Sequence, residues 1–421
     1  MYKIFRLFLF LLISSSSFAQ WQMVSNGLWP DNSNQFLRQI KAICNYNGTL
    51  FVANTYGHLA KSSDDGANWI TFSPPGFPTD TYINSLATLN NRLFFGALST
   101  GSFYGIYYTE DNGATVVEAN NGIPVSSTIV CLAVKDSKVY AGGLSFYVSS
   151  DQGNSWVTKA NGLPTFLFGV NVIAFDDAGA IYIGSNNRKI YKSTNEGDDW
   201  TQLGTNGLPT SGSGVGALIY SNGALIVSVG ADGIFTSSDD GANWTASTGI
   251  TATNHKPAND FITVGLNVIA ASAGGGAFIS SDNGSSWSVY NEGATSGLLC
   301  FTLKDNFIFA GGNGKGVFKR ENTAVSIYDE NLNEMKFELS QNYPNPFNPN
   351  TKIKYTVSNR QYGTLKVYDV LGNEISILVN EVKEPGEYEV EFNAGNLSSG
   401  VYLYHLSING LTQTRKMLLM K

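Results

Sequence analysis

A short string of the form Ser-x-Asp-x-Gly-x-x-Trp recurs along the first three quarters of the chain, and this repeat constrains the fold more than any other feature. Its first copy is Ser62–Trp69, and the tryptophan position returns roughly every 40 to 47 residues. A period of this length is typical of small β units that pack side by side. The aspartate and tryptophan positions of the six copies are Asp64 and Trp69, Asp111 and Val116, Asp151 and Trp156, Asn195 and Trp200, Asp239 and Trp244, and Asp282 and Trp287.

Each copy lies between two strand-like runs, so we interpret it as a hairpin turn. Around the fifth copy, residues 223–228 and 233–236 precede the string and residues 244–247 follow it. The aspartate can accept backbone N–H groups within the turn, glycine adopts positive φ, and tryptophan buries a large ring against the neighbouring unit. Two copies depart from the pattern, one through Asn195 and one through Thr109 and Val116. We expect those two turns to be less well fixed.

The composition agrees with an all-β protein. The chain has 421 residues, of which 45 are glycine, and 13% are aromatic. Many glycine turns between aromatic and β-branched runs indicate strands joined by tight connections. The net charge of −7 argues against a nucleic-acid partner, because such proteins carry a basic surface.

The number of units is predicted from the two ends of the repeat region. After the sixth copy, residues 299–303, 307–311 and 316–319 form three strand-like runs without a further string. Near the N-terminus, Trp21 is followed by an Asn-Gly-Leu sequence, as two of the string tryptophans, Trp156 and Trp200, are. We therefore predict a seven-bladed β-propeller over residues 20–322, in which Trp21 supplies the missing outer strand and closes the ring.

The repeat resembles the Asp-box, or BNR, repeat. The resemblance implies a propeller of the kind found in sialidases and some xyloglucan-type glycosidases. The same repeat occurs in propellers similar to photosystem II assembly factors and to sortilin-type receptors, which bind protein. The box aspartates are assigned to turn geometry, not to catalysis.

Three functional classes remain open on this basis. A sialidase needs converging arginines, but none of the four in the propeller stands in the Arg-Ile-Pro context of that family; they are Arg38, Arg92, Arg188 and Arg320. A glycosidase needs two carboxylates at a defined separation, for which the candidates are Asp31, Asp80, Asp260 and Glu292. We favour a non-catalytic binding or adhesion scaffold for protein or glycan. The alternatives are a carbohydrate-active hydrolase and a purely structural envelope protein.

The candidate binding residues lie in the irregular loops on the face opposite the boxes. Variable loops on one side of a regular scaffold commonly carry binding sites. The alternative is that the aromatic members only fill the gaps between blades. These residues are Trp29, Tyr56, His58, Phe77, Phe103, Tyr104, Phe166, Phe168, Arg188 and His255.

The first 19 residues are typical of a secretory signal peptide. Lys3 and Arg6 precede an apolar run over residues 7–13, and Ser17–Ala19 forms a small-residue cleavage site. The run is shorter than the roughly 20 residues that cross a bilayer, so no transmembrane segment is predicted. Three cysteines lie in apolar stretches and are interpreted as buried free thiols; they are Cys44, Cys131 and Cys300. The histidines are scattered, so we predict neither a metal site nor a cofactor.

The C-terminal region is predicted as a second β domain. Residues 323–337 are polar and are interpreted as a linker, and alternating patterns over residues 338–421 predict a small antiparallel β-sandwich. This region resembles the type A sorting domain of the type IX secretion system, also called the Por-type C-terminal domain. The residues that carry the resemblance include Pro344, Asn345, Pro346, Phe347, Gly372, Gly400, Lys416 and Lys421.

The resemblance implies a route and a partner for the chain. It implies export through the periplasm and across both membranes of a Bacteroidetes-type cell, with the type IX secretion machinery as the partner of the C-terminal domain. The protein would then be attached at the outer surface or released. The alternative is an ordinary accessory sandwich.

Overall fold

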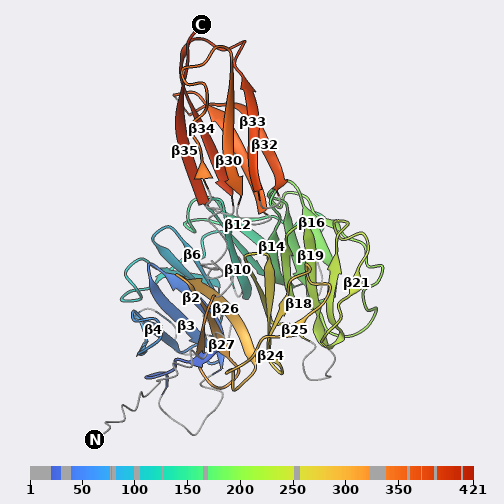
Figure 1. Cartoon of the computed structure of the whole chain (residues 1–421). Helices are drawn as coiled ribbons and strands as arrows, with labels where there is room; N and C mark the ends of the chain where they lie inside the picture. Colours follow the sequence, from blue (N-terminus) through green and yellow to red (C-terminus); the bar gives the residue numbers. More distant parts are fainter. Residues whose placement is uncertain are drawn as a thin grey trace, which may run out of the picture. The chain divides into compact units, whose positions relative to one another are not determined.

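The computed structural model describes residues 20–29, 39–75, 77, 82–98, 105–125, 127–164, 169–250, 257–322, 338–357, 361–370, 372–383, 386–408 and 411–421. The contacts within the chain divide it into two units, Met1–Val325 and Ser326–Lys421. The chain is all-β (Figure 1): among the described residues the one helical element is the short 3-10 turn Gly230–Asp232. No helix in those ranges is long and apolar enough to cross a membrane. The predicted signal peptide lies outside the described residues.

Seven four-stranded antiparallel sheets make up the described part of the first unit. Six of them take four consecutive strands, and the seventh takes its outer strand from the N-terminal segment. Sheets 1 to 7 are, from first to last strand, β2 (Ile40–Tyr46), β3 (Thr49–Asn54), β4 (Leu59–Ser62) and β5 (Ile70–Phe72); β6 (Tyr82–Leu89), β7 (Arg92–Leu98), β8 (Gly105–Thr109) and β9 (Val117–Glu118); β10 (Ile129–Lys135), β11 (Lys138–Gly143), β12 (Phe146–Ser149) and β13 (Val157–Thr158); β14 (Val170–Phe175), β15 (Ile181–Ser185), β16 (Ile190–Ser193) and β17 (Thr201–Gln202); β18 (Val215–Ser221), β19 (Ala224–Val229), β20 (Gly233–Ser237) and β21 (Thr245–Ala246); β22 (Asp260–Val264), β23 (Asn267–Ser272), β24 (Gly276–Ser280) and β25 (Ser288–Val289); and β26 (Leu298–Lys304), β27 (Phe307–Gly312), β28 (Val317–Glu321) and β1 (Gln22–Met23).

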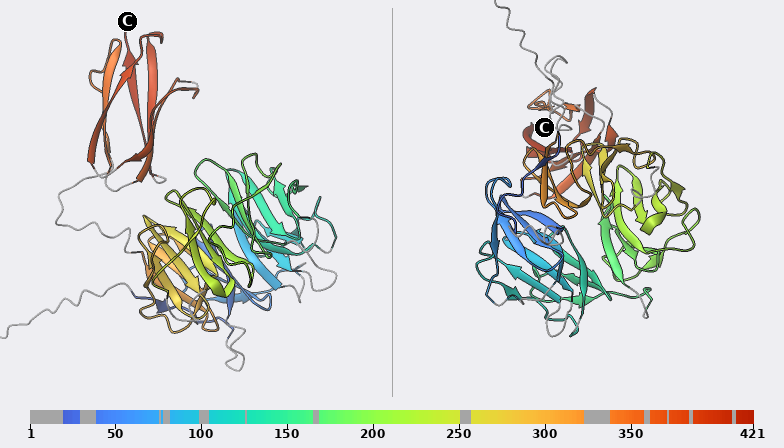
Figure 2. Two further views of the ribbon diagram at one scale, coloured as in Figure 1. Left: turned by 90° about the vertical axis from the view of Figure 1, so that its right-hand side faces the viewer. Right: turned by 90° about the horizontal axis from the view of Figure 1, so that it is seen from below.

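The first strand of each sheet, here called the inner strand, packs against the inner strand of the next sheet. The order runs β2, β6, β10, β14, β18, β22 and β26, and β26 packs against β2. The seven sheets therefore surround a common centre, as the right-hand view of Figure 2 shows. Tight hairpin turns connect the first and second strands within most of the sheets. Asn222 and Gly223, for example, have φ values of 49° and 84°, the positive values that two-residue hairpin turns require.

The repeated string forms the turn between the third and fourth strands. In the first copy, Asp64 Oδ1 accepts the backbone N–H of Asn68 at 2.8 Å, and Asp64 Oδ2 accepts its side-chain amide at 2.9 Å. The Ser62 hydroxyl donates to Asp64 and accepts the backbone N–H of Gly66 at 2.9 Å. The Trp69 ring is buried and donates its Nε1–H to the Val24 carbonyl at 2.7 Å. The carboxylate and tryptophan thus fix the turn against the preceding sheet.

The two departing copies are as well bonded as the others, which corrects our expectation. Thr109 supplies its hydroxyl to Asp111 and to the backbone N–H of Gly113, as serine does elsewhere. Asn195 Oδ1 accepts the backbone N–H of Asp199 at 2.9 Å, and its Nδ2–H donates to the Asp199 carboxylate at 2.8 Å. The expectation failed because the amide and the carboxylate have exchanged positions, so the same number of bonds forms.

The N-terminal segment completes sheet 7. In β1, Gln22 pairs with Lys319 and Met23 pairs with Phe318 of β28. Trp21, which is 2% exposed, donates its backbone N–H to Glu292 and its Nε1–H to the Tyr290 carbonyl at 2.8 and 2.7 Å. Two distant segments of the chain are therefore joined by the same backbone and tryptophan contacts that hold the other outer strands.

The three cysteines are free thiols. Cys44 and Cys300 are buried, but Cys131 is only half-buried, which corrects the expectation of three buried thiols. Burial raises the thiol pKa of all three, that of Cys131 to about 12. Within the described residues, no group of three or more His, Cys, Asp or Glu side chains is placed to hold a metal ion.

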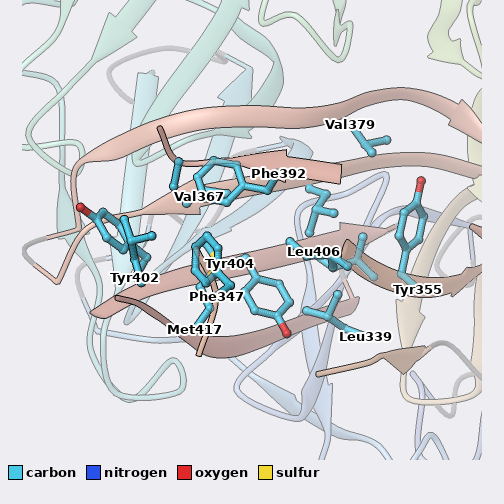
Figure 3. Packing of buried hydrophobic residues seen from close by; sticks show 14 of the residues in the cluster. Leu339, Phe347, Tyr355, Val367, Val379, Phe392, Tyr402, Tyr404, Leu406 and Met417 are labelled. Carbon is cyan, nitrogen blue, oxygen red and sulfur yellow. The ribbon is translucent and has the colours of Figure 1, made fainter. Parts of the chain in front are cut away.

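The second unit contains a three-stranded and a four-stranded antiparallel sheet. One cluster of buried side chains draws on both sheets, including Tyr355 and Phe392 from the first and Tyr404 and Leu406 from the second (Figure 3). The three-stranded sheet has the order β29 (Glu338–Leu339), β30 (Asn350–Val357) and β33 (Gly386–Asn393). The four-stranded sheet has the order β32 (Glu374–Lys383), β31 (Gln361–Tyr368), β34 (Gly400–Ile408) and β35 (Leu411–Leu419).

The motif residues of this unit tie its first loop to its last strand. Phe347 is 2% exposed and joins the buried cluster, and its backbone N–H donates to the Leu418 carbonyl at 3.0 Å. Asn345 Oδ1 accepts the backbone N–H of Leu418 at 2.9 Å. At the end of the chain, the Lys421 ammonium donates to the Gly395 carbonyl at 2.7 Å. The remaining motif residues lie in this same framework: Pro344 accepts from Asn342 and Thr351 through its carbonyl, Gly372 has a φ of 87°, Gly400 begins β34, and the Lys416 carbonyl accepts from Gln341.

A candidate ligand-binding channel

Each inner strand is irregular close to its first residue. In six of the seven sheets the pairing with the second strand shifts by one residue near that end, which marks a β-bulge. In sheet 6, Asn259 takes the equivalent position just before β22, and its N–H bonds to the carbonyl of Ala271, the partner of Asp260. Bulges redirect side chains and are common beside functional sites. The seven bulge residues are Lys41, Asn84, Val130, Asn171, Gly216, Asn259 and Leu299.

The bulge residues line a cavity at the centre of the seven sheets. The cavity has a volume of about 620 Å³ and receives side chains from all seven inner strands. The residue before each bulge is buried and apolar, so the bulge begins where the packed core ends. These preceding residues are Ile40, Ile83, Ile129, Val170, Val215, Ala258 and Leu298. The channel is thus a polar opening on a tightly packed apolar ring.

The residue that follows the bulge often links one sheet to the next. The Ser85 hydroxyl accepts the backbone N–H of Leu132 on the neighbouring inner strand at 2.9 Å. Asp260 Oδ2 accepts the N–H of Phe301 in the same way at 2.8 Å. The Cys131 and Cys300 thiols, at the same position in sheets 3 and 7, donate to carbonyls of the next sheet at 3.7 and 3.6 Å. These links fix the inner strands, and therefore the channel wall, before any ligand arrives.

Asp260 is the one carboxylate among the described residues that line the channel, and Lys41 is the one ammonium. Asp260 Oδ1 also accepts the backbone N–H of Phe261 at 2.9 Å. Surrounding protein removes water from this carboxyl group and raises its pKa to about 7, although two N–H donors oppose the shift. Asp260 therefore exchanges its proton near neutral pH while it holds sheets 6 and 7 together.

A chain of side-chain amides fixes the channel rim across sheets 1, 7 and 6. The Thr55 hydroxyl donates to Gln39 at 2.6 Å, and Gln39 Nε2–H donates to Asn313 Oδ1 at 2.7 Å. Asn313 Nδ2–H then donates to the Ala273 carbonyl at 3.1 Å, and the Ala273 N–H donates to Asn259 Oδ1 at 3.1 Å. In this part of the rim, the polar side chains therefore form hydrogen bonds with one another and with the backbone.

The predicted binding residues fall into three groups. Trp29 is 7% exposed and packs in the core beside His58, with ring centroids 6.4 Å apart. Phe77 is half-buried against Phe95 and Tyr107. These two rings fill space between sheets, the alternative noted for the aromatic members. Five others lie outside the described residues: Phe103, Tyr104, Phe166, Phe168 and His255.

The remaining three lie in loops between second and third strands, at the channel end of the sheets. Tyr56 and His58 are exposed in the loop after β3. The Arg188 guanidinium donates to the carbonyls of Thr210 and Gly212, which ties its loop to the connection between sheets 4 and 5. Arg188 thus supports the loop framework, whereas Tyr56 and His58 are accessible.

The described residues among those proposed for hydrolysis lie at separate places. Glu292 is exposed and pairs with Arg320 at 3.2 Å beside Tyr290. Arg92 pairs with Glu110 at 2.7 Å and also donates to the turn of the next repeat. Arg38, Asp31 and Asp80 lie outside the described residues. Of the two carboxylate candidates that the structure describes, Asp260 and Glu292, only Asp260 lines the cavity.

The amino-acid pattern did not identify the bulge residues. A bulge adds one residue to a strand without changing its apolar character, so Lys41, Asn84 and Asn171 read as ordinary strand-start residues. A usable signal exists in retrospect, because an aliphatic residue immediately precedes a polar one at the start of several inner strands, as in Ile40-Lys41 and Ile83-Asn84.

The first unit has the fold of known β-propellers. PorZ, a surface component of the type IX secretion system of Porphyromonas gingivalis, aligns with a TM-score of 0.51 at 14% identity, covering 91% of this chain and 60% of PorZ. YCF48 bound to D1 peptide gives a TM-score of 0.53 at 13% identity over 72% of this chain and 94% of that chain. The WD40 propeller domain of Doa1 gives 0.53 at 13% identity over 72% and 97%. At these identities the similarity concerns the fold alone.

One curated relative has sequence similarity to part of the chain. The oligoxyloglucan-reducing end-specific xyloglucanase of Emericella nidulans is 24% identical over 219 residues, covering 45% of this chain and 27% of that protein. The chain therefore spans about a quarter of the length of this relative.

The C-terminal region matches a family model. Residues 341–420 match the family described as the secretion system C-terminal sorting domain. This range contains the loop around Phe347 and the strand β35 to which it is bonded. The chain therefore carries a C-terminal sorting domain of this family, and it is exported by type IX secretion to the cell surface or the extracellular space.

Proposed function

We propose that the chain is an exported, seven-bladed Asp-box propeller that acts as a non-catalytic binding scaffold, followed by a sorting domain with a β-sandwich fold. In this proposal residues 1–19 are the signal peptide, 20–322 the propeller, 323–337 a linker and 338–421 the sorting domain, which the type IX secretion machinery recognises. The seven sheets described above are its blades. The ligand is a protein segment or a glycan that enters the channel.

The observation that carries the binding role is the ring of bulge residues. Seven inner strands place their irregular ends around one cavity of about 620 Å³. Amides from Asn84, Asn171 and Asn259 offer both donors and acceptors there. The wall is preorganised by links such as Ser85 to Leu132, which reduces the cost of ordering on binding.

Blocking the channel tests this role. A Cβ added to Gly216 would meet no atom closer than the Ala258 carbonyl oxygen, at 3.4 Å, so a side chain fits there and extends into the cavity. We expect Gly216→Phe in the full chain to fold normally and to lose binding on arrays of glycans and peptides. The matched control is Thr201→Phe on an exposed outer strand. Binding that survives Gly216→Phe would place the ligand elsewhere.

The xyloglucanase similarity favours a hydrolase as the second candidate. Asp260 is the carboxylate that such an activity would use in the channel, since its pKa near 7 suits a general acid. The test is release of reducing ends from xyloglucan oligosaccharides by the full chain, compared with Asp260→Asn. If the full chain releases reducing ends and Asp260→Asn does not, the hydrolase proposal would replace the scaffold proposal.

A further inference from the structure

Two neighbouring side chains of the bulge ring have no polar partner among the residues that the structure describes. Lys41 and Asn84 lie on β2 and β6, inner strands that pack against each other. Neither side chain forms a hydrogen bond or ion pair with a described residue. By contrast, Asn171 donates to the Val215 carbonyl at 3.0 Å and Asn259 accepts from Ala273. The channel carboxylate, Asp260, is on β22, separated from β2 by β26. Sheets 1 and 2 therefore present to the channel one cation and one amide that no described residue pairs with.

The same two sheets also contribute a pair of neighbouring tyrosines, one each. The ring centroids of Tyr56 and Tyr82 are 6.3 Å apart, with an angle of 41° between the rings. Tyr56 is 39% exposed in the loop after β3, and Tyr82 begins β6 two residues before Asn84. The loop is held by buried Asn54, whose side-chain oxygen accepts the N–H groups of Tyr56 and His58 at 2.9 Å each. The aromatic surface is therefore fixed in place.

We propose that this sector, formed by Lys41, Asn84, Tyr56 and Tyr82, recognises an acidic oligosaccharide through a uronate ring. The inference rests on the binding function proposed above and names its ligand class. A tyrosine ring packs on the C–H face of a sugar, and the phenol remains available to hydroxyl groups. The Asn84 amide both donates to and accepts from sugar hydroxyls. The Lys41 ammonium pairs with the uronate carboxylate in a charge-assisted bond.

The charge arrangement is what separates this ligand from other occupants. A neutral glycan would use the tyrosines and Asn84 but would leave the ammonium without an anion. In an acidic peptide the carboxylate and any stacking ring belong to different side chains, whereas a uronate carries its carboxylate and hydroxyl groups on the ring that packs on a tyrosine face. Among the described channel residues the one carboxylate, Asp260, is two inner strands away from Lys41, so we assign the anionic partner of Lys41 to the ligand.

The experiment measures binding of tetragalacturonic acid to the full chain by calorimetry, with its fully methyl-esterified form as the uncharged matched ligand. We expect binding of the acid, weakened at least about tenfold in the ester and in Lys41→Gln, and restored by Lys41→Arg. Tyr56→Ala and Asn84→Ala should each weaken binding by about tenfold. The control is Lys315→Gln, an exposed lysine in a loop at the same end of sheet 7, which should change nothing. A thermal melt of each variant shows whether the fold is retained.

Three results would overturn the inference. Equal affinity for the acid and the ester, unchanged affinity in folded Lys41→Gln, or binding of peptides alone would each remove the uronate assignment. If another ligand binds and Gly216→Phe abolishes that binding, the scaffold proposal stands while this inference fails. If no glycan or peptide binds the folded chain, the proposed function fails as well.

Discussion

Asn195 and Asp199 form the same side-chain hydrogen bond as Asp239 and Asn243 of the fifth repeat, but with the amide and the carboxylate at exchanged positions. The Asn195 amide donates to the Asp199 carboxylate at 2.8 Å, whereas in the fifth repeat Asn243 donates to Asp239 at 2.8 Å. Asp199 also accepts from Asn161 of the preceding connection, as Asn243 accepts from Asn206. In turns that pair a carboxylate with an amide, the two groups are therefore interchangeable between the two positions.

This exchange predicts a compensating pair of substitutions. Asn195→Asp places two carboxylates at hydrogen-bonding distance and should lower the free energy of unfolding by about 1 kcal/mol or more. The double variant Asn195→Asp with Asp199→Asn recreates the arrangement of the fifth repeat and should recover most of the loss. Urea unfolding of the two single variants and the double variant gives the coupling energy. Additive losses would show that the two side chains act independently.

Acid should destabilise the protein through the turn aspartates. Bonds from Thr115 hold the pKa of Asp111 at about 2, and bonds from Asn243 do the same for Asp239. Because these values lie below the ordinary aspartate value near 3.8, the stabilisation is complete above about pH 4 and is lost as the pH falls toward 2. We expect the melting temperature to fall over that interval.

The loss of stability in acid is tested with variants of the turn aspartates whose side-chain partners are hydroxyl groups. Thr115 and Ser286 can turn to accept from an amide, so Asp111→Asn and Asp282→Asn keep the turn hydrogen-bonded. Their combination should flatten the melting curve against pH between 4 and 2. An unchanged slope would assign the acid sensitivity to other groups.

The closing strand should make a large contribution to stability. Trp21 is buried, stacks on Phe301 with centroids 6.2 Å apart and bonds to the Tyr290 carbonyl. Trp21→Ala should cost about 3–5 kcal/mol of unfolding free energy, a loss typical of a large buried ring. Trp21→Phe keeps most of the packing and loses one hydrogen bond, worth about 1 kcal/mol. Guanidinium unfolding of both variants measures the difference; equal, small losses would mean that sheet 7 does not depend on β1.

Asp260 should make stability fall as the pH rises toward neutral. Its pKa of about 7 exceeds the ordinary value of 3.8, so the folded state retains a proton that the unfolded chain releases. Stability should therefore decline between about pH 4 and 7 and then level off. Asp260→Ser keeps an acceptor for Phe301, as Ser85 does for Leu132, and should remove this decline. Each pKa unit corresponds to about 1.4 kcal/mol, so chemical unfolding at pH 5 and 8 resolves the change.

Sequence patterns predicted the repeat framework because its determinants are local. The turn needs an aspartate, a glycine and a tryptophan at fixed spacing, and Trp21 was recognisable from the residues that follow it. The position of Asn195 was misjudged because the exchange with Asp199 becomes visible only when both partners are considered. The sorting region was predictable from its alternating pattern and its motif around Phe347.

The channel was less predictable because it depends on contacts between sheets. Whether Trp29 faces solvent or the core is decided by the neighbouring sheet, and its loop sequence alone suggested an exposed ring. The bulge at Lys41 adds a single residue to an apolar strand, and nothing in the periodicity marks it. That Lys41 and Asn84 have no polar partner within the described part of the chain likewise emerges only once seven strands are brought together.

The pairing of β1 with β28 also has a mechanical consequence for an exported chain. β28 is the last strand before the segment that leads to the sorting domain, and it lies between β27 and β1 instead of at a sheet edge. A pull applied through that segment acts first on the ladder with β27, which spans all of β28, and then on the two pairs with β1 at Phe318 and Lys319. Tension on the end of β28 would therefore be shared between the last hairpin of the first unit and its N-terminal strand, which lie far apart in the sequence.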